Sequence, residues 1–289
     1  MPEPLLRCSD LRVDVDGAPA LDGLTLETNA QHVVVLGAPR ALFEAASGVR
    51  RVARGSLHVA GASPGEAVAS LLVGACPCDE PLPPTWTAVE LATWTSRLAG
   101  FPKGEATALA RASVDRLELR ELASRPLQTV PPQARRAASL AAVLATSPRV
   151  VFVEDPLRDL SDEASRWYAR VVLKALGDTP WVVFASRMSL SSPILLHAEE
   201  AVLTSSSRAL AQGPPAELAV AERAYVARVH GDPASLAEWL AERGGSMEHD
   251  GARVQLRLGP NQTTAELLGA CAERDVTVVE LLPLSRALA

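Results

Sequence analysis

The amino-acid sequence of 289 residues is short of lysine and contains no long apolar run. Lys103 and Lys174 are its only lysines, and arginine supplies the remaining basic side chains. The net charge is -6 and is spread along the chain, without the basic stripe that nucleic-acid binding requires. The sequence has no stretch of about 20 apolar residues that would cross a bilayer. We therefore expect neither nucleic-acid binding nor direct insertion into a membrane.

Cysteine and histidine are too sparse and too scattered to predict a metal site. Cys76 and Cys78 are closer together than the usual zinc-binding spacing, and no second cysteine cluster answers them. The histidines offer no pair at ligand spacing on one predicted helix. The beginning of the chain lacks the basic, apolar and small-residue regions of a secretory signal. We expect free thiols in a reducing cytoplasm and no metal cofactor.

What the sequence does contain is a regular alternation of strands and helices. Residues 5–15 and 23–28 predict a strand pair around a turn at 16–19, and the apolar residues 33–36 predict a strand buried on both faces. Thr87 with Glu90 predicts a capped helix start. More strands are expected at 57–60, 71–73, 150–153, 182–185, 200–204 and 208–212, and helices at 87–98, 104–118, 134–146 and 162–176. Residues 64–72 are expected to form a short helix or a loop. The alternation favours an α/β fold with a mostly parallel sheet and an antiparallel start.

The last part of the chain follows a different pattern. We place a domain boundary at about residue 222, so that residues 223–289 form a small α+β domain. Asp232 is the expected cap of the first helix in this domain. The predicted elements are a strand at 225–230, a helix at 233–243, a hairpin of 246–249 and 253–258 around Asp250-Gly251, a helix at 263–274 and a strand at 276–281. This βαββαβ order is the ferredoxin-like pattern.

Residues 33–48 have the strand, glycine turn and helix of a phosphate-binding loop, but not its side chains. The motif is strand–GxxxxGK[ST]–helix, and Gly37 fits its first glycine. Counting on, the second glycine falls at Leu42, the lysine at Phe43 and the hydroxyl at Glu44. A cationic hydrogen bond to a phosphate is worth roughly 1.5–3 kcal/mol, and Phe43 offers none. Arg40 is the one nearby cation available to replace it, and this replacement is the weaker interpretation.

Five landmarks follow Gly37 in a fixed order. They are Pro77-Cys78, Val130–Ala134 before a long alanine-rich helix, Glu154-Asp155 after an apolar strand, residues 182–187, and Ala-Gln-Gly-Pro-Pro-Ala-Glu-Leu at 211–218. Together they resemble the ATP-binding subunit of an ABC transporter over essentially the whole chain. The resemblance implies a P-loop NTPase-like core with an antiparallel β subdomain and a helical lobe at about 80–147, within residues 1–222. The tail is similar to the C-terminal extension of the subgroup that pairs with a separate exporter-type permease.

The resemblance gives most landmarks a role that this sequence does not fulfil. The aromatic residue that stacks on adenine falls near Val15, and the glutamine that contacts Mg²⁺ falls at Cys78. The switch histidine falls at Arg187, whose side chain cannot accept a proton. The acid pair keeps both carboxylates, with Glu154 able to touch Mg²⁺ through water. Asp155 stands for the catalytic glutamate but is one methylene shorter.

Two further segments are implied to face partners. The signature loop, Leu-Ser-Gly-Gly-Gln in the family, reads Val130, Pro131, Pro132, Gln133 and Ala134 here. In the family this loop offers backbone N–H groups and a serine to the γ-phosphate held by a second subunit, and prolines have no N–H. The loop with Pro81 and Trp86 corresponds to the region that faces the permease, with local core packing as the other interpretation of its tryptophans.

These departures lead to the hypothesis of a pseudo-ATPase. The chain would dock on a polytopic membrane permease at the inner face of the cell membrane and pair with a second ATP-binding subunit, in a homo- or heterodimer, without a cofactor of its own. The first alternative is a divergent but active ATPase that energises transport and binds ATP and Mg²⁺ through Arg40, Glu154 and Asp155. The second alternative is an adaptor or regulator outside transport.

Overall fold

The computed structural model describes residues 3–37, 39–79, 81–189, 192–220, 224–250, 253–259 and 262–283. The chain divides into two compact units, Met1–Pro215 and Ala216–Ala289, and each is described by itself. The domain boundary predicted at about 222 lies outside the described residues. None of the described helices combines the length and the apolar character that crossing a membrane requires.

The first unit is built around a six-stranded sheet with the order β5-β6-β7-β3-β8-β9. All neighbours are parallel except β9, which runs antiparallel to β8. Strands β6, β7 and β8 are buried along their whole length, which explains their continuous apolar sequences. The strands are β3 (His32–Leu36), β5 (Val73–Cys76), β6 (Val150–Glu154), β7 (Trp181–Ala185), β8 (Glu200–Thr204) and β9 (Ala209–Gly213).

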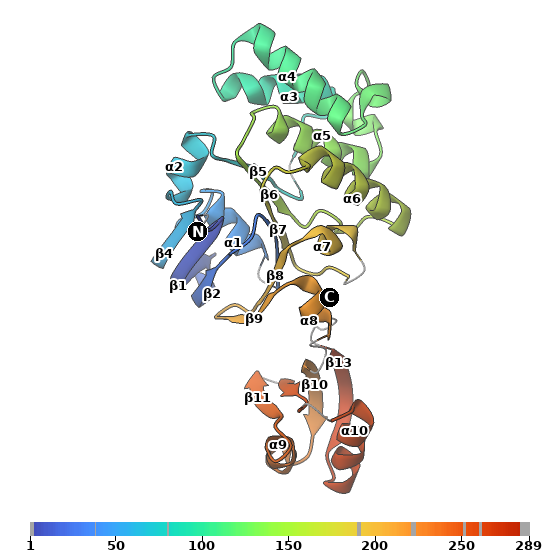
Figure 1. Ribbon diagram of the computed structural model, residues 1–289. Helices are drawn as coiled ribbons and strands as arrows, with labels where there is room; N and C mark the ends of the chain where they lie inside the picture. The colour runs from blue at the N-terminus through green and yellow to red at the C-terminus, as the bar shows by residue number, and fades with distance from the viewer. Residues whose placement is uncertain are drawn as a thin grey trace. The chain divides into compact units, whose positions relative to one another are not determined.

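A second, antiparallel sheet has the order β2-β1-β4, with β1 (Leu6–Val15), β2 (Ala18–Glu27) and β4 (Arg54–Val59). The predicted strand pair is confirmed, but β2 begins at Ala18 and not at residue 23. The connecting turn needs only Asp16 and Gly17, which both have positive φ. Helix α1 (Pro39–Ala46) joins a single hydrophobic core with residues of both sheets (Figure 1).

The remaining helices of this unit include a lobe formed by α3, α4 and α5, seen in green in Figure 1. Thr87 caps α3 in the predicted capping box with Glu90. The short helix α7 was not expected. The helices are α2 (Pro64–Ala69), α3 (Ala88–Leu98), α4 (Lys103–Arg116), α5 (Pro132–Leu144), α6 (Asp162–Leu176) and α7 (Pro193–His197), with 3-10 turns at Arg120–Leu122 and Leu127–Thr129. Helix α8 (Pro215–Val220) begins at the last residue of this unit and continues into the second.

Strand β5 begins later than the predicted strand at 71–73. Leu71 has a φ of 58°, which interrupts an extended chain there. Position 74 inside β5 requires glycine, because a Cβ atom there would come within 2.6 Å of Val143 on α5. The small residues of β5 are therefore explained by close packing against a helix that is distant in the sequence. They give little local signal for a strand.

The second unit has the predicted βαββαβ order. Its strands are β10 (Ala224–His230), β11 (Ser246–Asp250), β12 (Arg253–Arg257) and β13 (Thr277–Pro283), and its helices are α9 (Pro233–Ala241) and α10 (Thr264–Glu273). The antiparallel order β11-β12-β10-β13 is the ferredoxin-like topology. Asp232 caps α9 by accepting the N–H of Ala234 at 3.0 Å. The turn expected after Asp250 lies at 251–252, outside the described residues.

Candidate functional site

The turn between β3 and α1 is the place where the sequence predicts a remnant phosphate loop. β3 ends at Leu36 and α1 begins at Pro39, so the connection consists of two residues, Gly37 and Ala38. Gly37 has a φ of 100° and donates its N–H to the carbonyl of Ala185 at 3.1 Å. Most of the positions that the motif assigns to the loop therefore lie in the first turns of α1, and not in an extended loop that wraps around a phosphate.

The side chains at the second-glycine and lysine positions belong to the hydrophobic core. Leu42 is fully buried and Phe43 is 3% exposed. The ring of Phe43 packs edge to face on Phe184, with centroids 5.7 Å apart, and Phe184 packs in the same way on Phe152. Phe43 therefore points into the packed interior and stabilises the contact between α1 and the central sheet.

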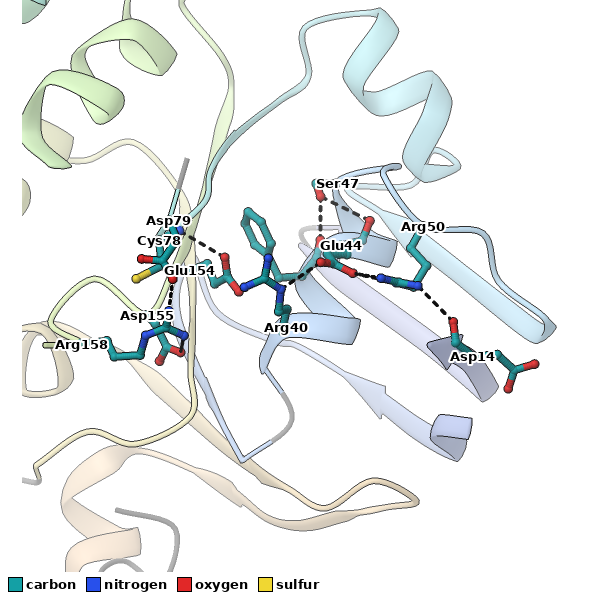
Figure 2. Close-up of polar contacts among 11 residues, drawn as sticks. Asp14, Arg40, Glu44, Ser47, Arg50, Cys78, Asp79, Glu154, Asp155 and Arg158 are labelled. Atoms are coloured by element: carbon teal, nitrogen blue, oxygen red, sulfur yellow. Dashed lines mark hydrogen bonds and ion pairs between the residues drawn. The ribbon is translucent and has the colours of Figure 1, made fainter. Parts of the chain in front are cut away.

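Glu44, at the hydroxyl position, lies between two arginines. Its Oε1 accepts from Nε of Arg40 at 3.0 Å and its Oε2 accepts from Nε of Arg50 at 2.6 Å (Figure 2). Burial alone would raise the pKa of Glu44, but the hydrogen bonds from Arg50 and Arg40 outweigh it and lower the pKa. Glu44 is therefore a carboxylate at the place where the motif puts the hydroxyl that holds Mg²⁺.

Arg40 is the one cation of this turn that remains exposed, with 61% of its side chain accessible. Its pKa is raised first by the hydrogen bond to Glu44 and then by the nearby charge of Glu154. Figure 2 shows its guanidinium between these two carboxylates. The residues around Gly37 do not fit a triphosphate, because the turn is short, the lysine position is buried and a carboxylate occupies the hydroxyl position.

Glu154 ends β6 and is only 2% exposed. Its Oε2 accepts the backbone N–H of Cys78 at 3.1 Å, which ties the loop after β5 to the end of β6. Its Oε1 is buried and has no hydrogen-bond partner within the described part of the chain. The Cys78 thiol is also buried, and this burial raises its pKa to about 11. Cys78 thus contacts Glu154 through its backbone and stays a neutral thiol.

Asp155 is 4% exposed, and both of its carboxylate oxygens are hydrogen-bonded. Oδ1 accepts from the N–H and the hydroxyl of Ser186 at 2.7 and 2.9 Å, and Oδ2 accepts from the same hydroxyl at 3.0 Å. Arg158 lies 3.6 Å from Oδ2 and also pairs with Asp79 in the loop after β5. The network of Asp79, Arg158, Asp155 and Ser186 therefore links three chain segments. Figure 2 shows Asp79, Asp155 and Arg158 of this network.

The sequence analysis did not identify Asp79, Arg158 and Ser186 as part of this network. The spacing of Asp155 and Arg158 is the only local signal for it. Arg187, at the predicted switch position, is exposed, and its neighbour Ser186 makes the hydrogen bonds to Asp155.

The expected signature segment forms the entrance to α5. Val130 is buried, whereas Pro131 and Pro132 are exposed and Gln133 is partly buried. Pro131 is the N-cap and Pro132 the first helical residue, a position where the fixed φ of proline suits a helix and its missing N–H costs nothing. The prolines thus have a local structural role at this helix start.

Two tryptophans near the start of the helical lobe form an exposed apolar surface. Trp86 packs edge to face on Trp94, with ring centroids 5.8 Å apart. Trp94 is 54% exposed and Leu98, one turn later on α3, is 71% exposed. Pro81, in the loop before them, is also exposed. The predicted partner-facing residues Pro81 and Trp86 therefore lie beside accessible apolar side chains.

A cavity of about 410 Å³ lies between the loop after β5 and the first turns of α5. It brings Cys78 and Asp79 together with Pro132 and Arg136, which are far away in the sequence. No group of three or more His, Cys, Asp or Glu side chains suited to a metal ion occurs among the described residues.

No family model matches the sequence, and no curated protein matches it. Solved structures do resemble it. CbiO1 of Clostridium perfringens, part of the ABC transporter complex CbiONQ, superposes with a TM-score of 0.64 and 15% identity over 75% of this chain and 91% of that one. A nucleotide-free ATP-binding cassette from an ABC transporter gives 0.63 and 13%, over 75% and 95% of the two chains. The ADP conformation of the cassette MJ1267 gives 0.60 and 13%, over 73% and 91%. The fold is that of the ABC ATP-binding cassettes, as predicted.

Proposed function

We propose that the chain is a catalytically degenerate ATP-binding-type subunit of an ABC-type transport complex. It supports the assembly as a pseudo-ATPase, docks on a membrane permease and pairs with a second ATP-binding subunit. Its place is at the inner face of the cell membrane, held there by the permease. The similarity in fold to cassettes such as CbiO1, whose structure is described as part of an ABC transporter complex, supports the transport context.

The position of Phe43 carries this proposal. A lysine in the motif must reach a phosphate, whereas Phe43 is packed on Phe184 in the core. Because α1 already begins at Pro39, a small backbone shift would not turn residue 43 outward without breaking the helix. Glu44 is already paired with Arg40 and Arg50 at the same turn, so it does not supply the hydroxyl that holds Mg²⁺ in the motif.

The acid pair supports the same proposal. A general base needs a lone pair directed at the attacking water, but the Asp155 oxygens already accept from Ser186 and face Arg158. The carboxylate is therefore used to join β6 to the segment after β7. We propose that Asp155 has a structural role here.

A hydrolysis assay on the purified chain tests the loss of catalysis. We expect that any release of phosphate from ATP is the same for the wild-type protein, Glu154→Gln and Asp155→Asn, because a contaminating enzyme would be its source. A rate that falls about a hundredfold or more in either variant would show that the acids are catalytic and would contradict the proposal.

One observation favours the alternative of a divergent, active ATPase. The Oε1 atom of Glu154 is buried and has no hydrogen-bond partner among the residues that the structure describes, and the exposed cation Arg40 lies close to this carboxylate. An unpaired carboxylate oxygen is the kind of group that holds a hydrated Mg²⁺. In that case Arg40→Gln would lower the hydrolysis rate of the purified chain, whereas the pseudo-ATPase predicts no change.

The apolar surface formed by the partly buried Trp86 with the exposed Trp94 and Leu98 is the proposed contact with the permease. An exposed aromatic side chain beside a second one is typical of the centre of an interface, where it becomes buried. Isolation of the chain from its native membrane, with a polytopic protein and a second ATP-binding subunit at fixed stoichiometry, tests the assembly. A chain that never co-purifies with a membrane protein would instead support an adaptor outside transport.

A further inference from the structure

The cavity beside α5 has the size and lining of a small-molecule site. Its volume of about 410 Å³ falls within the range of about 300–1,000 Å³ that is usual for such sites. Leu82, Pro84 and Leu127 contribute apolar side chains to the lining. Gln128, Ser139 and two arginines contribute polar groups. A lining with both kinds of side chain suits an amphipathic ligand.

The arginines of the cavity have no carboxylate partner among the described residues. Arg135 makes no hydrogen bond or ion pair through its side chain with any described residue, and Arg136 donates only to the carbonyl of Pro156, at 3.0 Å. Asp79 is the sole carboxylate among the described residues that line the cavity, and it pairs with Arg158. Within the described part of the chain, the lining therefore carries a positive charge without a paired carboxylate.

The helix makes this charge more unfavourable. α5 begins at Pro132, and its first turn contains no acidic residue. Arg135 and Arg136 directly follow this first turn, near the positive end of the helix dipole, which favours a nearby anion and not a further cation. The Cys78 thiol does not offset the charge, because its burial keeps it protonated. An anion from outside would relieve this concentration of positive charge.

We propose that the cavity binds a small organic acid. Its carboxylate pairs with Arg135 and Arg136, since guanidinium groups are well suited to carboxylates, and its apolar part lies against Leu82, Pro84 and Leu127. The proposal does not depend on nucleotide binding or on the permease. It gives the chain a ligand site separate from the β3–α1 turn.

The test uses the purified full chain and three probes. The fluorescent sulfonate 8-anilinonaphthalene-1-sulfonate, an aromatic anion, reports on the cavity, and octanoate and octylammonium compete with it as an acid and an amine of equal chain length. We expect octanoate to displace the dye and octylammonium not to. Displacement by inorganic phosphate as strong as that by octanoate would overturn the organic-acid proposal, and so would equal competition by the amine or no competition by octanoate at millimolar concentration.

Variants place the binding at the arginines. Arg135→Gln should weaken octanoate binding about tenfold or more, because a charge-assisted hydrogen bond is lost, and the double variant Arg135→Gln/Arg136→Gln should weaken it further. The single variant removes no contact within the described chain, so it should stay folded even if the double variant does not. Arg111→Gln, which changes an exposed arginine on α4, is the matched control and should bind normally. Unchanged octanoate affinity in Arg135→Gln would overturn the proposal.

Discussion

Asp155 accepts both the backbone N–H and the hydroxyl of Ser186, at 2.7 and 2.9 Å. The bond joins the end of β6 to the residue that follows β7, two adjacent parallel strands of the central sheet. Asp155 holds this position with a φ of 38°, which is uncommon for any residue other than glycine. Asp155 thus joins two neighbouring strands at their carboxyl ends, where the catalytic base of an active cassette would be expected.

Replacing Asp155 with Asn should lower the free energy of unfolding by about 1–3 kcal/mol. Asn would replace the buried carboxylate that accepts from the Ser186 hydroxyl and lies 3.6 Å from Arg158 with a neutral amide. Urea denaturation followed by circular dichroism measures the change. Asp159→Asn is the control, because Asp159 is 83% exposed and pairs only weakly with Arg158, and it should stay within about 0.5 kcal/mol of wild type. Equal stability of the two variants would contradict a structural role for Asp155.

Restoring the lysine of the motif should unfold the protein and not restore nucleotide binding. Phe43→Lys removes a buried aromatic ring and puts an ammonium group against Phe184. We expect a loss of at least the roughly 3–5 kcal/mol that is typical of deleting a buried Phe. Phe43→Leu keeps most of the apolar volume and should cost about 1–2 kcal/mol. Thermal melting of the two variants measures these losses of stability. A Phe43→Lys protein as stable as wild type would place residue 43 outside the core.

The free energy of unfolding should fall on acidification, because Glu118, which contacts Arg170 and Lys174, becomes protonated. The hydrogen bonds from Arg170 and Lys174 lower the pKa of Glu118 from 4.5 to about 2. Because the folded-state pKa is depressed, the contribution is fully present above about pH 4.5 and is lost as the pH falls toward 2. Urea midpoints measured from pH 6 to pH 2.5 should therefore fall less steeply for Glu118→Gln than for wild type.

The control for this titration is Glu121→Gln, which changes an exposed glutamate nearby in the chain. Its pH profile should run parallel to that of wild type. The effect of Glu118 should also shrink at high salt, because the ion pairs lie near the surface and are screened. Identical slopes for all three proteins at low salt would refute this assignment.

Trp94→Ala should weaken assembly with the permease while leaving the fold intact. Trp94 is 54% exposed and its main described ring contact is Trp86, so its loss should cost about 0.5–1.5 kcal/mol of stability. Because Trp94 would lie at the centre of the interface, its replacement should lower the yield of complex about tenfold or more. Val49→Ala, at a residue 78% exposed and outside the helical lobe, should leave the yield unchanged. Equal yields for both variants would move the interface elsewhere.

Local sequence signals were sufficient for most of the fold. The apolar runs at β3, β6 and β7, the capping box at Thr87 and the cap at Asp232 each act over a few residues, so a single sequence reveals them. β5 could not be bounded in this way, because Gly74 is explained only by the approach of Val143 from α5. The start of β2 was missed because the turn before it has only two residues. Pro19, which lies inside the strand, made the beginning of the strand look like part of the turn.

The candidate site was less predictable for the same reason. Counting residues placed Phe43 at the lysine position, but its burial against Phe184 is a long-range contact that spacing does not contain. The pairing of Asp79 with Arg158 joins residues on different elements. The cavity is equally non-local, since Cys78 and Arg136 meet only after the helical lobe has packed.

Calorimetric titration of Mg-ATP into the purified chain tests the central claim most directly. A pseudo-ATPase should show no saturable binding up to about 1 mM ATP, which corresponds to a binding free energy weaker than about -4 kcal/mol. The titration should look the same for wild type and for Arg40→Gln. A micromolar dissociation constant, near -8 kcal/mol, that is lost in Arg40→Gln or Glu154→Gln would contradict it and establish a working nucleotide site.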